Sequence, residues 1–567
     1  MKIAIAQQNY HIGNFEYNRE KIIAAIEKAK IDKVDLIVFS ELSVCGYPPR
    51  DFLEFDDFIN KCYESIDIIA VHTNGIGVIL GSPQRNPVPE GKNLFNSAVF
   101  LYNNAVIGTA HKSLLPTYDV FDEYRYFEPT NEWKIIPFKG ERIALTICED
   151  IWNLTENPLY RISPIDMLIK ENPTILINVT ASPFDYDHDD DRKEIILENI
   201  KRYHLPMIYC NTVGAQTEII FDGGSLVFDK SGRLCKELKY FEEDYCAVAT
   251  EDLESGKLQE VKMYQFIDER VARLKDNNKV VEYLTSHKNI SQIHRALLLG
   301  IRDYFKKMGF TKATLGASGG IDSSVVQALA VEALGRENVH VLLMPSEYSS
   351  SHSVSDAEQL SKSLGNRYDI VPIKDIYNQF LNTLDPLFNN LPFSIAEENI
   401  QSRSRGNLLM ALANKFDYIL LNTSNKSELA VGYGTLYGDM AGGLSILGDL
   451  YKMQIFALAK YINRQKEIIP QNIITKPPSA ELRPGQKDTD SLPEYEILDR
   501  VLYEYIERRK GPKEITALGY DAQLVARILK LVNNAEYKRN QFCPILRISR
   551  KAFGVGRRIP IVAKYLG

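Results

Sequence analysis

Short apolar runs typical of β-strands alternate with stretches of helical periodicity along the first half of the chain. Apolar residues recur at helical spacing from Asn18 to Lys30, and Asn103-Asn104 separates two strand-like runs as in a tight hairpin. A second hairpin is predicted over residues 224–237, with its turn at 229–232. The other strand candidates are residues 3–6, 36–39, 77–80, 97–102, 105–110, 143–147, 174–179 and 207–211. This mixture predicts a layered sandwich of sheets and helices.

The second half has a more regular alternation of strands and helices. Residues 250–276 are charged and lack strand periodicity, so we predict a linker at 251–276 between a domain of residues 1–250 and one of residues 277–567. Helices are predicted at 291–308, 323–334, 355–364 and 397–415, and strands at 314–315, 339–344, 368–371 and 418–421. This alternation predicts an α/β fold with a doubly wound parallel sheet, which binds ligands at the carboxyl ends of its strands.

Composition and charge exclude several classes of protein. With 45% hydrophobic and 10% aromatic residues among 567, the chain is too apolar for intrinsic disorder. Its net charge of -7 argues against a polycation that holds nucleic acid. The 7 cysteines are scattered without a Cys-x-x-Cys pair, the first residues turn polar too early for a signal peptide, and no apolar run is long enough to span a membrane. We therefore expect a cytoplasmic protein with no membrane partner.

The sharpest local feature is a glycine-rich turn between a predicted strand and a predicted helix, Gly316-Ala-Ser-Gly-Gly-Ile-Asp-Ser323. Glycines let the backbone approach a ligand closely, and a helix start offers N–H donors at the positive end of its dipole. The turn is neither a Walker A loop nor a Gly-x-Gly-x-x-Gly dinucleotide turn. It is a candidate anion site, and the alternative is an ordinary strand-to-helix turn capped by Asp322.

Two side-chain patterns accompany this turn. Asp322 offers a hard carboxylate for Mg²⁺, which would offset phosphate charge. Residues 422–428, Asn-Thr-Ser-Asn-Lys-Ser-Glu, follow a predicted strand and open a helix. Taken alone they form a capping pattern, with Thr423 or Ser424 as the cap and Glu428 in the first turn.

Both patterns resemble known families. Ser-Gly-Gly-x-Asp-Ser resembles the pyrophosphate loop of the ATP pyrophosphatases, and Thr-x-Asn-Lys-Ser-Glu resembles a segment of the NAD+ synthetases. The resemblance implies a Rossmann-like domain with ATP as co-substrate and Mg²⁺ as cofactor, in which Asp322 and Glu428 are metal ligands. The ATP-binding residues that it implies are Gly316, Ala317, Ser318, Gly319, Gly320, Ile321, Asp322, Ser323 and Thr423.

Further segments carry the same resemblance to NAD+ synthetases. Residues 397–406 resemble their dinucleotide-binding helix, 448–452 their Gly-Asp-Leu-x-Lys segment, and the Pro-rich residues 476–493 a mobile loop over the active site. Without the resemblance, a long polar stretch of this kind is either a lid or a plain surface loop. The implied contacts to deamido-NAD+ are Asn399, Arg405, Glu428, Lys452 and Lys538.

The C-terminal residues 537–567 contain eight Lys or Arg and no acidic residue. This run is either a solvated face or a nucleic-acid site, and it lacks the interleaved aromatic residues of a base-stacking platform. Its resemblance to the end of NAD+ synthetases implies that Lys538 contacts the dinucleotide. We therefore expect no nucleic-acid partner.

In the first half, three predicted strands each lead into one reactive side chain. These side chains are Glu41 after residues 36–39, Lys112 after 105–110 and Cys148 after 143–147. A lone Cys after a strand is most often inert core, and a lone Glu or Lys is usually at the surface. Their order and spacing resemble the nitrilase superfamily, whose amidases use a Glu-Lys-Cys triad on an α-β-β-α sandwich.

The three residue types suit amide hydrolysis. A neutral thiol with an ordinary pKa of about 8.5 is a weak nucleophile, so a nearby carboxylate must take its proton. A fixed cation stabilises the oxyanion of the tetrahedral intermediate. The resemblance therefore makes Cys148 the nucleophile, Glu41 the general base and Lys112 the oxyanion stabiliser.

The same resemblance implies glutamine contacts at Tyr118, Ser182 and residue 188. Relatives commonly carry Lys at the position of His188, which lies here in the acidic run 185–191, whereas Arg192 four residues later is retained. A neutral His at residue 188 lacks the charge to pair with the glutamine α-carboxylate, for which Arg192 is the alternative partner.

Taken together, the two halves resemble glutamine-dependent NAD+ synthetases over nearly the whole chain. The resemblance implies amidation of deamido-NAD+ through an adenylate, with ammonia from glutamine, in a homo-oligomer that is a dimer or larger. The alternatives are an ammonia-only synthetase with a degenerate amidase domain, another ATP-pyrophosphatase amidotransferase such as a GMP or asparagine synthetase, and a nucleic-acid-binding protein. The Glu41-Lys112-Cys148 set disfavours the GMP and asparagine synthetases, which use different glutaminase folds.

Overall fold

The computed structural model describes residues 1–154, 159–186, 188–254 and 279–565. The chain divides into two compact units, residues 1–268 and 269–567, and each is described by itself. The first residues of the predicted linker belong to helix α6 (Thr250–Glu254), and its residues 255–276 lie outside the described part of the chain. In the described ranges, none of the helices combines the length and the apolar character that crossing a membrane would require.

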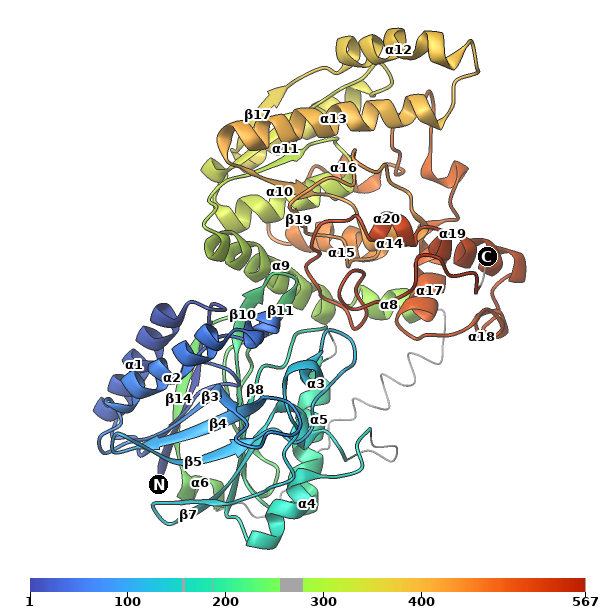
Figure 1. Cartoon of the computed structure of the whole chain (residues 1–567). Helices are drawn as coiled ribbons and strands as arrows, with labels where there is room; N and C mark the ends of the chain where they lie inside the picture. The colour runs from blue at the N-terminus through green and yellow to red at the C-terminus, as the bar shows by residue number, and fades with distance from the viewer. Residues whose placement is uncertain (155–158, 187, 255–278, 566–567) are drawn as a thin grey trace. The chain divides into compact units, whose positions relative to one another are not determined.

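The first unit contains two six-stranded sheets, whose strand orders are β14-β1-β2-β3-β4-β5 and β13-β12-β9-β8-β7-β6 (Figure 1). The strands of the first sheet are β1 (Lys2–Gln7), β2 (Leu36–Val38), β3 (Gly77–Arg85), β4 (Leu94–Tyr102), β5 (Ala105–His111) and β14 (Asp244–Ala249). Those of the second are β6 (Ile136–Phe138), β7 (Glu141–Ile147), β8 (Ile175–Thr180), β9 (Met207–Asn211), β12 (Leu226–Phe228) and β13 (Leu234–Glu237). A separate hairpin pairs β10 (Val213–Gln216) with β11 (Ile219–Asp222).

The two sheets face each other across one apolar core. Ile5 and Val38 of the first sheet share this core with Leu145 and Ile177 of the second. Helices α4 (Pro164–Leu168) and α5 (His188–Tyr203) pack on the outer face of the second sheet, and α1 (Phe15–Ile31) and α2 (Asp56–Ala70) are the long helices of the first sheet. The predicted α-β-β-α sandwich is confirmed.

The second unit is built on a parallel sheet of order β17-β16-β15-β18-β19. Its strands are β15 (Ala313–Gly316), β16 (Val339–Leu343), β17 (Arg367–Ile370), β18 (Ile419–Asn422) and β19 (Leu444–Ser445). Helix α13 (Ile395–Phe416) packs on one face, where Leu409 belongs to the same buried apolar cluster as Leu342 and Leu420 of the sheet. Helices α9 (His287–Met308), α10 (Ile321–Leu334) and α15 (Lys452–Ile462) pack together on the other side (Figure 1). The predicted doubly wound parallel sheet is confirmed.

The remaining α-helices in the described part of this unit pack around the sheet and its carboxyl edge. They are α8 (Val280–Leu284), α11 (Ser351–Leu364), α12 (Lys374–Phe388), α14 (Lys426–Val431), α16 (Gln471–Thr475), α17 (Tyr495–Ile506), α18 (Pro512–Ala517), α19 (Ala522–Asn534) and α20 (Glu536–Arg539). Sequence patterns predicted neither α12 nor the helices after β19.

Both predicted hairpins are confirmed. Strands β4 and β5 pair antiparallel around Asn103 and Asn104, whose φ angles of 49° and 65° are the left-handed values that such a turn needs. Strands β12 and β13 form the second hairpin. Helix α9 begins four residues earlier than predicted, because Ser286 caps it by accepting a hydrogen bond from the Asn289 N–H.

Candidate functional site

In the first unit, Lys112 and Glu41 come together although 70 residues separate them. Lys112 directly follows β5, Glu41 follows β2, and the Lys112 Nζ lies 2.7 Å from Glu41 Oε1. Neither side chain is exposed to solvent. A buried charge is stable only when paired, so each of these two groups fixes the other.

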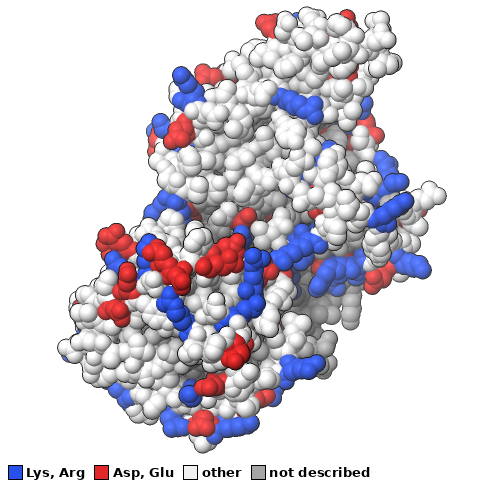
Figure 2. Space-filling model, in the orientation of Figure 1, with Lys and Arg blue, Asp and Glu red and all other residues white. Residues whose placement is uncertain are grey.

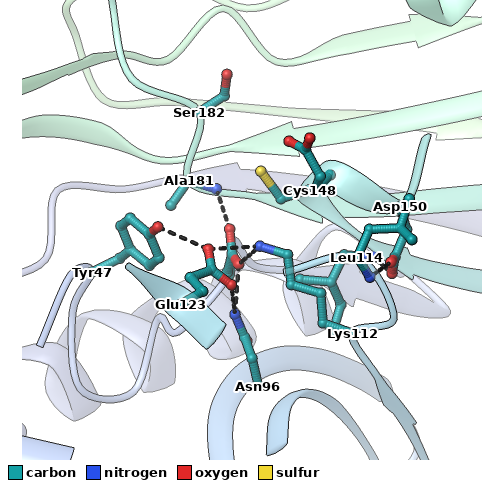
Figure 3. A network of polar contacts seen from close by, with 12 residues as sticks. Tyr47, Asn96, Lys112, Leu114, Glu123, Cys148, Asp150, Ala181 and Ser182 are labelled. Carbon is teal, nitrogen blue, oxygen red and sulfur yellow. Dashed lines mark hydrogen bonds and ion pairs between the residues drawn. The ribbon is translucent and has the colours of Figure 1, made fainter. Parts of the chain in front are cut away.

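A second carboxylate, Glu123, binds the same ammonium, and sequence patterns did not predict it. Glu123 begins the short helix α3 (Glu123–Tyr126), and its Oε1 lies 2.8 Å from Lys112 Nζ and accepts a hydrogen bond from the Tyr47 hydroxyl at 2.8 Å (Figure 3). Burial by itself would lower the pKa of Lys112, but the charges of Glu123 and Glu41 outweigh it and raise that pKa well above its ordinary value. Lys112 is therefore a permanent cation.

Two further donors hold the Glu41 carboxylate. Asn96 Nδ2 on β4 donates to Glu41 Oε1 at 2.7 Å, and the Ala181 N–H donates to Oε2 at 2.9 Å. With Lys112, three donors from three segments therefore fix both oxygens of this carboxylate. Such a network restricts Glu41 to one orientation.

Cys148 begins a single 3-10 turn, residues Cys148–Ile151, directly after β7. Its φ of 43° lies in the left-handed region, which non-glycine residues adopt only where surrounding structure enforces it. Figure 3 shows its sulfur on the side of the turn that faces the Lys112 ammonium. Burial and the Glu41 charge raise the pKa of the Cys148 thiol, and Lys112 opposes this rise. The thiol is therefore neutral at rest and needs a base to become a nucleophile.

Asp150 joins the Cys148 turn to the segment that carries Lys112. Its Oδ1 accepts hydrogen bonds from the Ser113 and Leu114 N–H groups, both at 2.9 Å, and its Oδ2 accepts from the Ile147 N–H at 3.0 Å. Burial raises the pKa of Asp150 to about 6. One side chain thus fixes the ends of β5 and β7 relative to each other.

Glu149 follows Cys148 in the chain and belongs to a separate group of hydrogen-bonded side chains. It accepts hydrogen bonds from the Tyr118 hydroxyl at 3.0 and 2.9 Å and from the Tyr160 hydroxyl at 3.2 Å. Burial raises the pKa of Glu149 to about 7. Tyr118 was a predicted contact, whereas Glu149 and Tyr160 were not.

For the other predicted glutamine contacts, the described part of the structure shows no side chain that points toward Lys112. The Ser182 N–H donates to Asn211 Oδ1 at 2.9 Å, and in Figure 3 its hydroxyl points away from the Lys112 ammonium. His188 begins α5, and its side chain lies outside the described part of the structure. Arg192 is buried and forms an ion pair with Asp222 at 2.5 Å while donating to the Gly223 carbonyl. Its guanidinium is therefore committed within the protein.

In the second unit, a cavity of about 310 Å³ opens at the carboxyl end of β15. Eight of the nine predicted ATP-binding residues line it, namely Gly316, Ala317, Ser318, Gly320, Ile321, Asp322, Ser323 and Thr423. Gly319 is not among its lining residues. Its φ is 75°, and a Cβ there would lie 2.1 Å from the Ser353 carbonyl oxygen, so only glycine permits the turn to lie against α11.

Lys452 reaches into this cavity between two carboxylates. Its Nζ lies 2.6 Å from Asp322 Oδ2 and 3.1 Å from Glu428 Oε1. Burial by itself would lower the pKa of Lys452, but Asp322 and Glu428 raise it above the ordinary value, while burial raises the pKa of Glu428 to about 7. Asp488 also lines the cavity and accepts a hydrogen bond from the Tyr495 hydroxyl at 2.9 Å. One lysine therefore faces three carboxylates.

The predicted cap of α14 is wrong. Neither Thr423 nor Ser424 caps this helix; Asn425 does, by accepting a hydrogen bond from the Glu428 N–H at 2.9 Å. Its amide nitrogen donates to Asp322 Oδ1 at 3.0 Å. Because the cap is two residues further along the chain, Thr423 is not needed to cap the helix, and it lines the cavity.

The predicted dinucleotide contacts divide into two groups. Arg405 lines the cavity with Lys452 and Glu428, and burial lowers the pKa of Arg405 to about 10. Asn399 and Lys538 are not among the lining residues. Asn399 Oδ1 accepts from the Thr435 hydroxyl at 2.7 Å, and Lys538 Nζ donates to the Gly432 and Gly434 carbonyls at 2.8 and 2.7 Å.

The Pro-rich segment predicted as a loop over the site reaches the cavity, where residues 476–482 line one wall. The Glu481 carboxylate accepts hydrogen bonds from the Ser350 N–H at 3.2 Å and the Ser353 hydroxyl at 2.8 Å, at the start of α11. Gln401 on α13 donates to the Leu482 carbonyl at 2.9 Å. Two helices thus hold this segment beside the glycine-rich turn.

Two basic side chains of the C-terminal run are paired within the protein. Arg539 and Arg557 both bind the Glu536 carboxylate, at 2.7 and 2.5 Å. These two arginines therefore stabilise the fold of this unit, which disfavours a nucleic-acid site in residues 537–567.

Comparison with known proteins matches the two units to two different families. A carbon-nitrogen hydrolase family model matches residues 2–263, and an NAD synthase family model matches residues 293–542. The glutamine-dependent NAD(+) synthetases of Synechocystis sp. and Thermotoga maritima are 43% and 39% identical to the chain, and each alignment covers at least 99% of both proteins. The glutamine-dependent NAD+ synthetase of Acinetobacter baumannii, solved with ADP, has a TM-score of 0.74 at 36% identity and covers 99% of this chain and 98% of its own.

Proposed function

Because this chain belongs to the glutamine-dependent NAD(+) synthetase family, we propose which of its residues carry out the two half-reactions of such a ligase. The enzyme amidates deamido-NAD+ with glutamine as the nitrogen donor. In the proposal, the residues around Cys148 release ammonia from glutamine. The cavity around residues 316–323 activates the acceptor carboxylate with ATP.

The first half-reaction begins with proton transfer from the Cys148 thiol to Glu41. The thiolate attacks the side-chain amide carbon of glutamine, and the oxyanion that forms is stabilised by the Lys112 ammonium. The amide nitrogen takes the proton back from Glu41 and leaves as ammonia, after which Glu41 activates water to hydrolyse the thioester to glutamate. The observation that supports this assignment is the burial of Lys112 between Glu41 and Glu123 beside the strained Cys148 turn.

Glu149 is the proposed receptor for the glutamine α-ammonium group. Its carboxylate lies beside Cys148, and its pKa of about 7 means that a substrate cation would stabilise its charged form. The Tyr118 and Tyr160 hydroxyls hold that carboxylate in place. Ser182 and His188 stay predictions as glutamine contacts.

In the second half-reaction, the carboxylate of deamido-NAD+ attacks the α-phosphorus of ATP and pyrophosphate leaves. The N–H groups at the start of α10 and the cations of Lys452 and Arg405 would bind the phosphate oxygens. Ammonia then attacks the acyl carbon of the adenylate, AMP leaves, and the amide forms. Thr423 is the proposed further contact to ATP, and Asn399 and Lys538 would act by holding the loop at residues 432–435.

Mg²⁺ fits the same cavity together with ATP. Asp322, Glu428 and Asp488 place three carboxylates around one lysine, an excess of negative charge that a divalent cation would balance. In the described ranges, no group of three or more His, Cys, Asp or Glu side chains is arranged to hold a metal by itself. Mg²⁺ is commonly bound by one or two carboxylates plus substrate phosphates, and Asp322 and Glu428 would provide the two. The ion would supply charge neutralisation for the departing pyrophosphate.

A second copy of this chain is the proposed protein partner. Helices α12 and α13 expose large apolar side chains, and Figure 2 shows few charged residues on the visible face of α12. The most exposed are Leu387 at 77% and Ile395 at 71%. Large apolar side chains left exposed on helices are candidates for burial in a protein interface. Light scattering should find a dimer or larger assembly for the natural chain and a smaller species for Leu387→Asp with Ile395→Asp; an unchanged mass would contradict this interface.

The central test is NAD+ formation with glutamine or with ammonium as the nitrogen source. Cys148→Ala should lose the glutamine-dependent reaction by about 1,000-fold or more, because its nucleophile is gone, and keep the ammonium-dependent rate. Cys45→Ala, which removes another buried thiol of the same unit, is the matched control and should keep both rates. Retention of the glutamine reaction by Cys148→Ala would remove the nucleophile assignment.

A further inference from the structure

Asp499 is a fully buried carboxylate of α17 that neither half-reaction uses directly. Its Oδ1 accepts a hydrogen bond from the Ser427 hydroxyl at 2.5 Å, and its Oδ2 accepts from the Met453 N–H at 2.9 Å. The Ser427 oxygen in turn accepts from the Lys452 N–H at 2.9 Å. Asp499 therefore connects α14 with the beginning of α15.

The residues that Asp499 holds are sequence neighbours of the cavity side chains. Ser427 precedes Glu428, and Met453 follows Lys452. The Lys452 and Met453 N–H groups are the first two of α15 and would otherwise have no partner within that helix. Satisfying them from α14 and α17 fixes the backbone from which the Lys452 side chain extends.

Helix α17 contacts the same lysine a second time. The Lys452 Nζ lies 5.1 Å from the centre of the Tyr495 ring, within range of a cation–π interaction. Tyr495 and Asp499 are four residues apart, so they share one face of the helix. This face of α17 therefore supports both the ammonium and the backbone of Lys452.

We propose that Asp499 is a positioning residue for adenylation: by joining Ser427 to the start of α15, it holds the Lys452 ammonium between Asp322 and Glu428, where the ATP phosphates must bind. The inference rests on the proposed role of Lys452 in that step. A shift of about 1 Å in a group that stabilises the transition state can cost about 100-fold in rate. Loss of Asp499 should therefore slow adenylation more than it weakens substrate binding.

The test measures exchange of labelled pyrophosphate into ATP in the presence of deamido-NAD+, which reports adenylation without ammonia transfer. For Asp499→Asn, whose amide nitrogen cannot accept a hydrogen bond, we expect kcat of exchange to fall between about 10- and 100-fold and KM for deamido-NAD+ to stay within about twofold. Glu504→Gln is the matched control, because Glu504 is an equally buried carboxylate of α17 that pairs with Lys510 at 2.6 Å. It should keep the exchange rate within about twofold.

Two further variants distinguish an error in the positioning role of Asp499 from an error in the proposed role of Lys452. Ser427→Ala removes the hydroxyl between Asp499 and the Lys452 N–H but leaves the Met453 contact, so kcat should fall by about fivefold even if Asp499→Asn does not fold. Lys452→Met should abolish exchange. If Lys452→Met loses exchange while Asp499→Asn and Ser427→Ala keep it, the positioning role is wrong. If Lys452→Met keeps exchange, the proposed role of Lys452 fails instead.

Discussion

Each of the two candidate sites holds a buried lysine between carboxylates, Lys112 in the first unit and Lys452 in the second, and the two lysines differ in what surrounds them. Lys112, Glu41 and Glu123 are at most 5% exposed, and donors from Tyr47, Asn96 and the backbone of residue 181 complete the cluster. Lys452 is equally buried, but its partners Asp322 and Glu428 are 19% and 17% exposed and border an open cavity.

The difference matches the chemistry proposed for each site. Hydrolysis of a neutral amide needs a base and a cation in fixed geometry, and a sealed cluster supplies them without reorganisation. Adenylation brings a highly charged triphosphate and a metal ion into the site, so carboxylate oxygens and cations must stay accessible. A lysine paired with carboxylates therefore forms a preorganised catalytic cluster in the first unit, and a cluster open to charged ligands in the second.

The largest expected effect comes from breaking the sealed cluster. Lys112→Met leaves two buried carboxylates without a cation, so we expect a loss of about 3–5 kcal/mol in unfolding free energy and of at least about 1,000-fold in glutamate release from glutamine. Lys426→Met is the matched control: Lys426 is equally buried, between Asp449 and Glu507, but in the second unit. It should lower stability to a similar degree and leave glutamate release unchanged. A Lys112→Met enzyme that still hydrolyses glutamine would contradict the oxyanion role.

An intermediate effect is expected from the open cluster. Asp322→Asn removes a charge that neighbours Lys452 and the proposed metal, so NAD+ formation should fall at least about 100-fold with glutamine and with ammonium alike. Its unfolding free energy should change by less than about 1 kcal/mol, because water reaches this carboxylate. Asp369→Asn, at the edge strand β17, is the control and should stay within about twofold in rate. Equal rates for the two variants would remove Asp322 from the proposed site.

A smaller effect separates substrate binding from chemistry in the first unit. Glu149→Gln loses the charge proposed to hold the glutamine ammonium, so KM for glutamine should rise between about 10- and 100-fold while the ammonium-dependent rate stays unchanged. Glu141→Gln, at the opposite end of β7, should leave KM for glutamine unaltered. A change in kcat at constant KM would assign Glu149 to the chemical step instead.

The last prediction concerns stability and not catalysis: it is a pH dependence of the free energy of unfolding that comes from the same carboxyl. Folding raises the pKa of Glu149 from 4.5 to about 7, so the unfolded chain loses this proton at lower pH than the folded chain. The contribution of Glu149 therefore lowers stability as pH rises from about 4.5 to 7, and Glu149→Gln should gain up to about 3 kcal/mol relative to the natural chain between pH 4.5 and 8. Chemical denaturation at several pH values measures this gain, and a constant difference would contradict the raised pKa.

Residues that end strands or form contiguous patterns could be found from the sequence. Glu41, Lys112 and Cys148 each follow a strand, and their order and spacing resemble the nitrilase superfamily, while the turn at residues 316–323 lies between a strand and a helix and resembles a pyrophosphate loop. Glu123, Asn96 and Asp499 carry no such pattern. Their roles arise from tertiary contacts with distant segments. A single acid on a helix, such as Glu123 or Asp499, or a single amide on a strand, such as Asn96, has many commoner explanations.

Prediction from the sequence was also limited where several neighbouring residues could play the same role. Three neighbouring side chains, Thr423, Ser424 and Asn425, could each cap α14, and the sequence offers no means to decide among them. In the structure Asn425 accepts the hydrogen bond from the Glu428 N–H, and its amide nitrogen also donates to Asp322 of another helix. Likewise, the resemblance implied that Lys538 contacts the dinucleotide. It did not predict that the Lys538 ammonium donates to the Gly432 and Gly434 carbonyls.

The left-handed backbone of Cys148 has a consequence for protein engineering. Glycine adopts such a φ without the steric cost of about 1 kcal/mol that a Cβ atom incurs, so a redesign scored only on thermal stability would favour glycine at residue 148. That replacement would delete the sulfur that we propose as the nucleophile of the glutamine reaction. At position 148, stability therefore favours glycine, whereas the proposed catalysis requires cysteine.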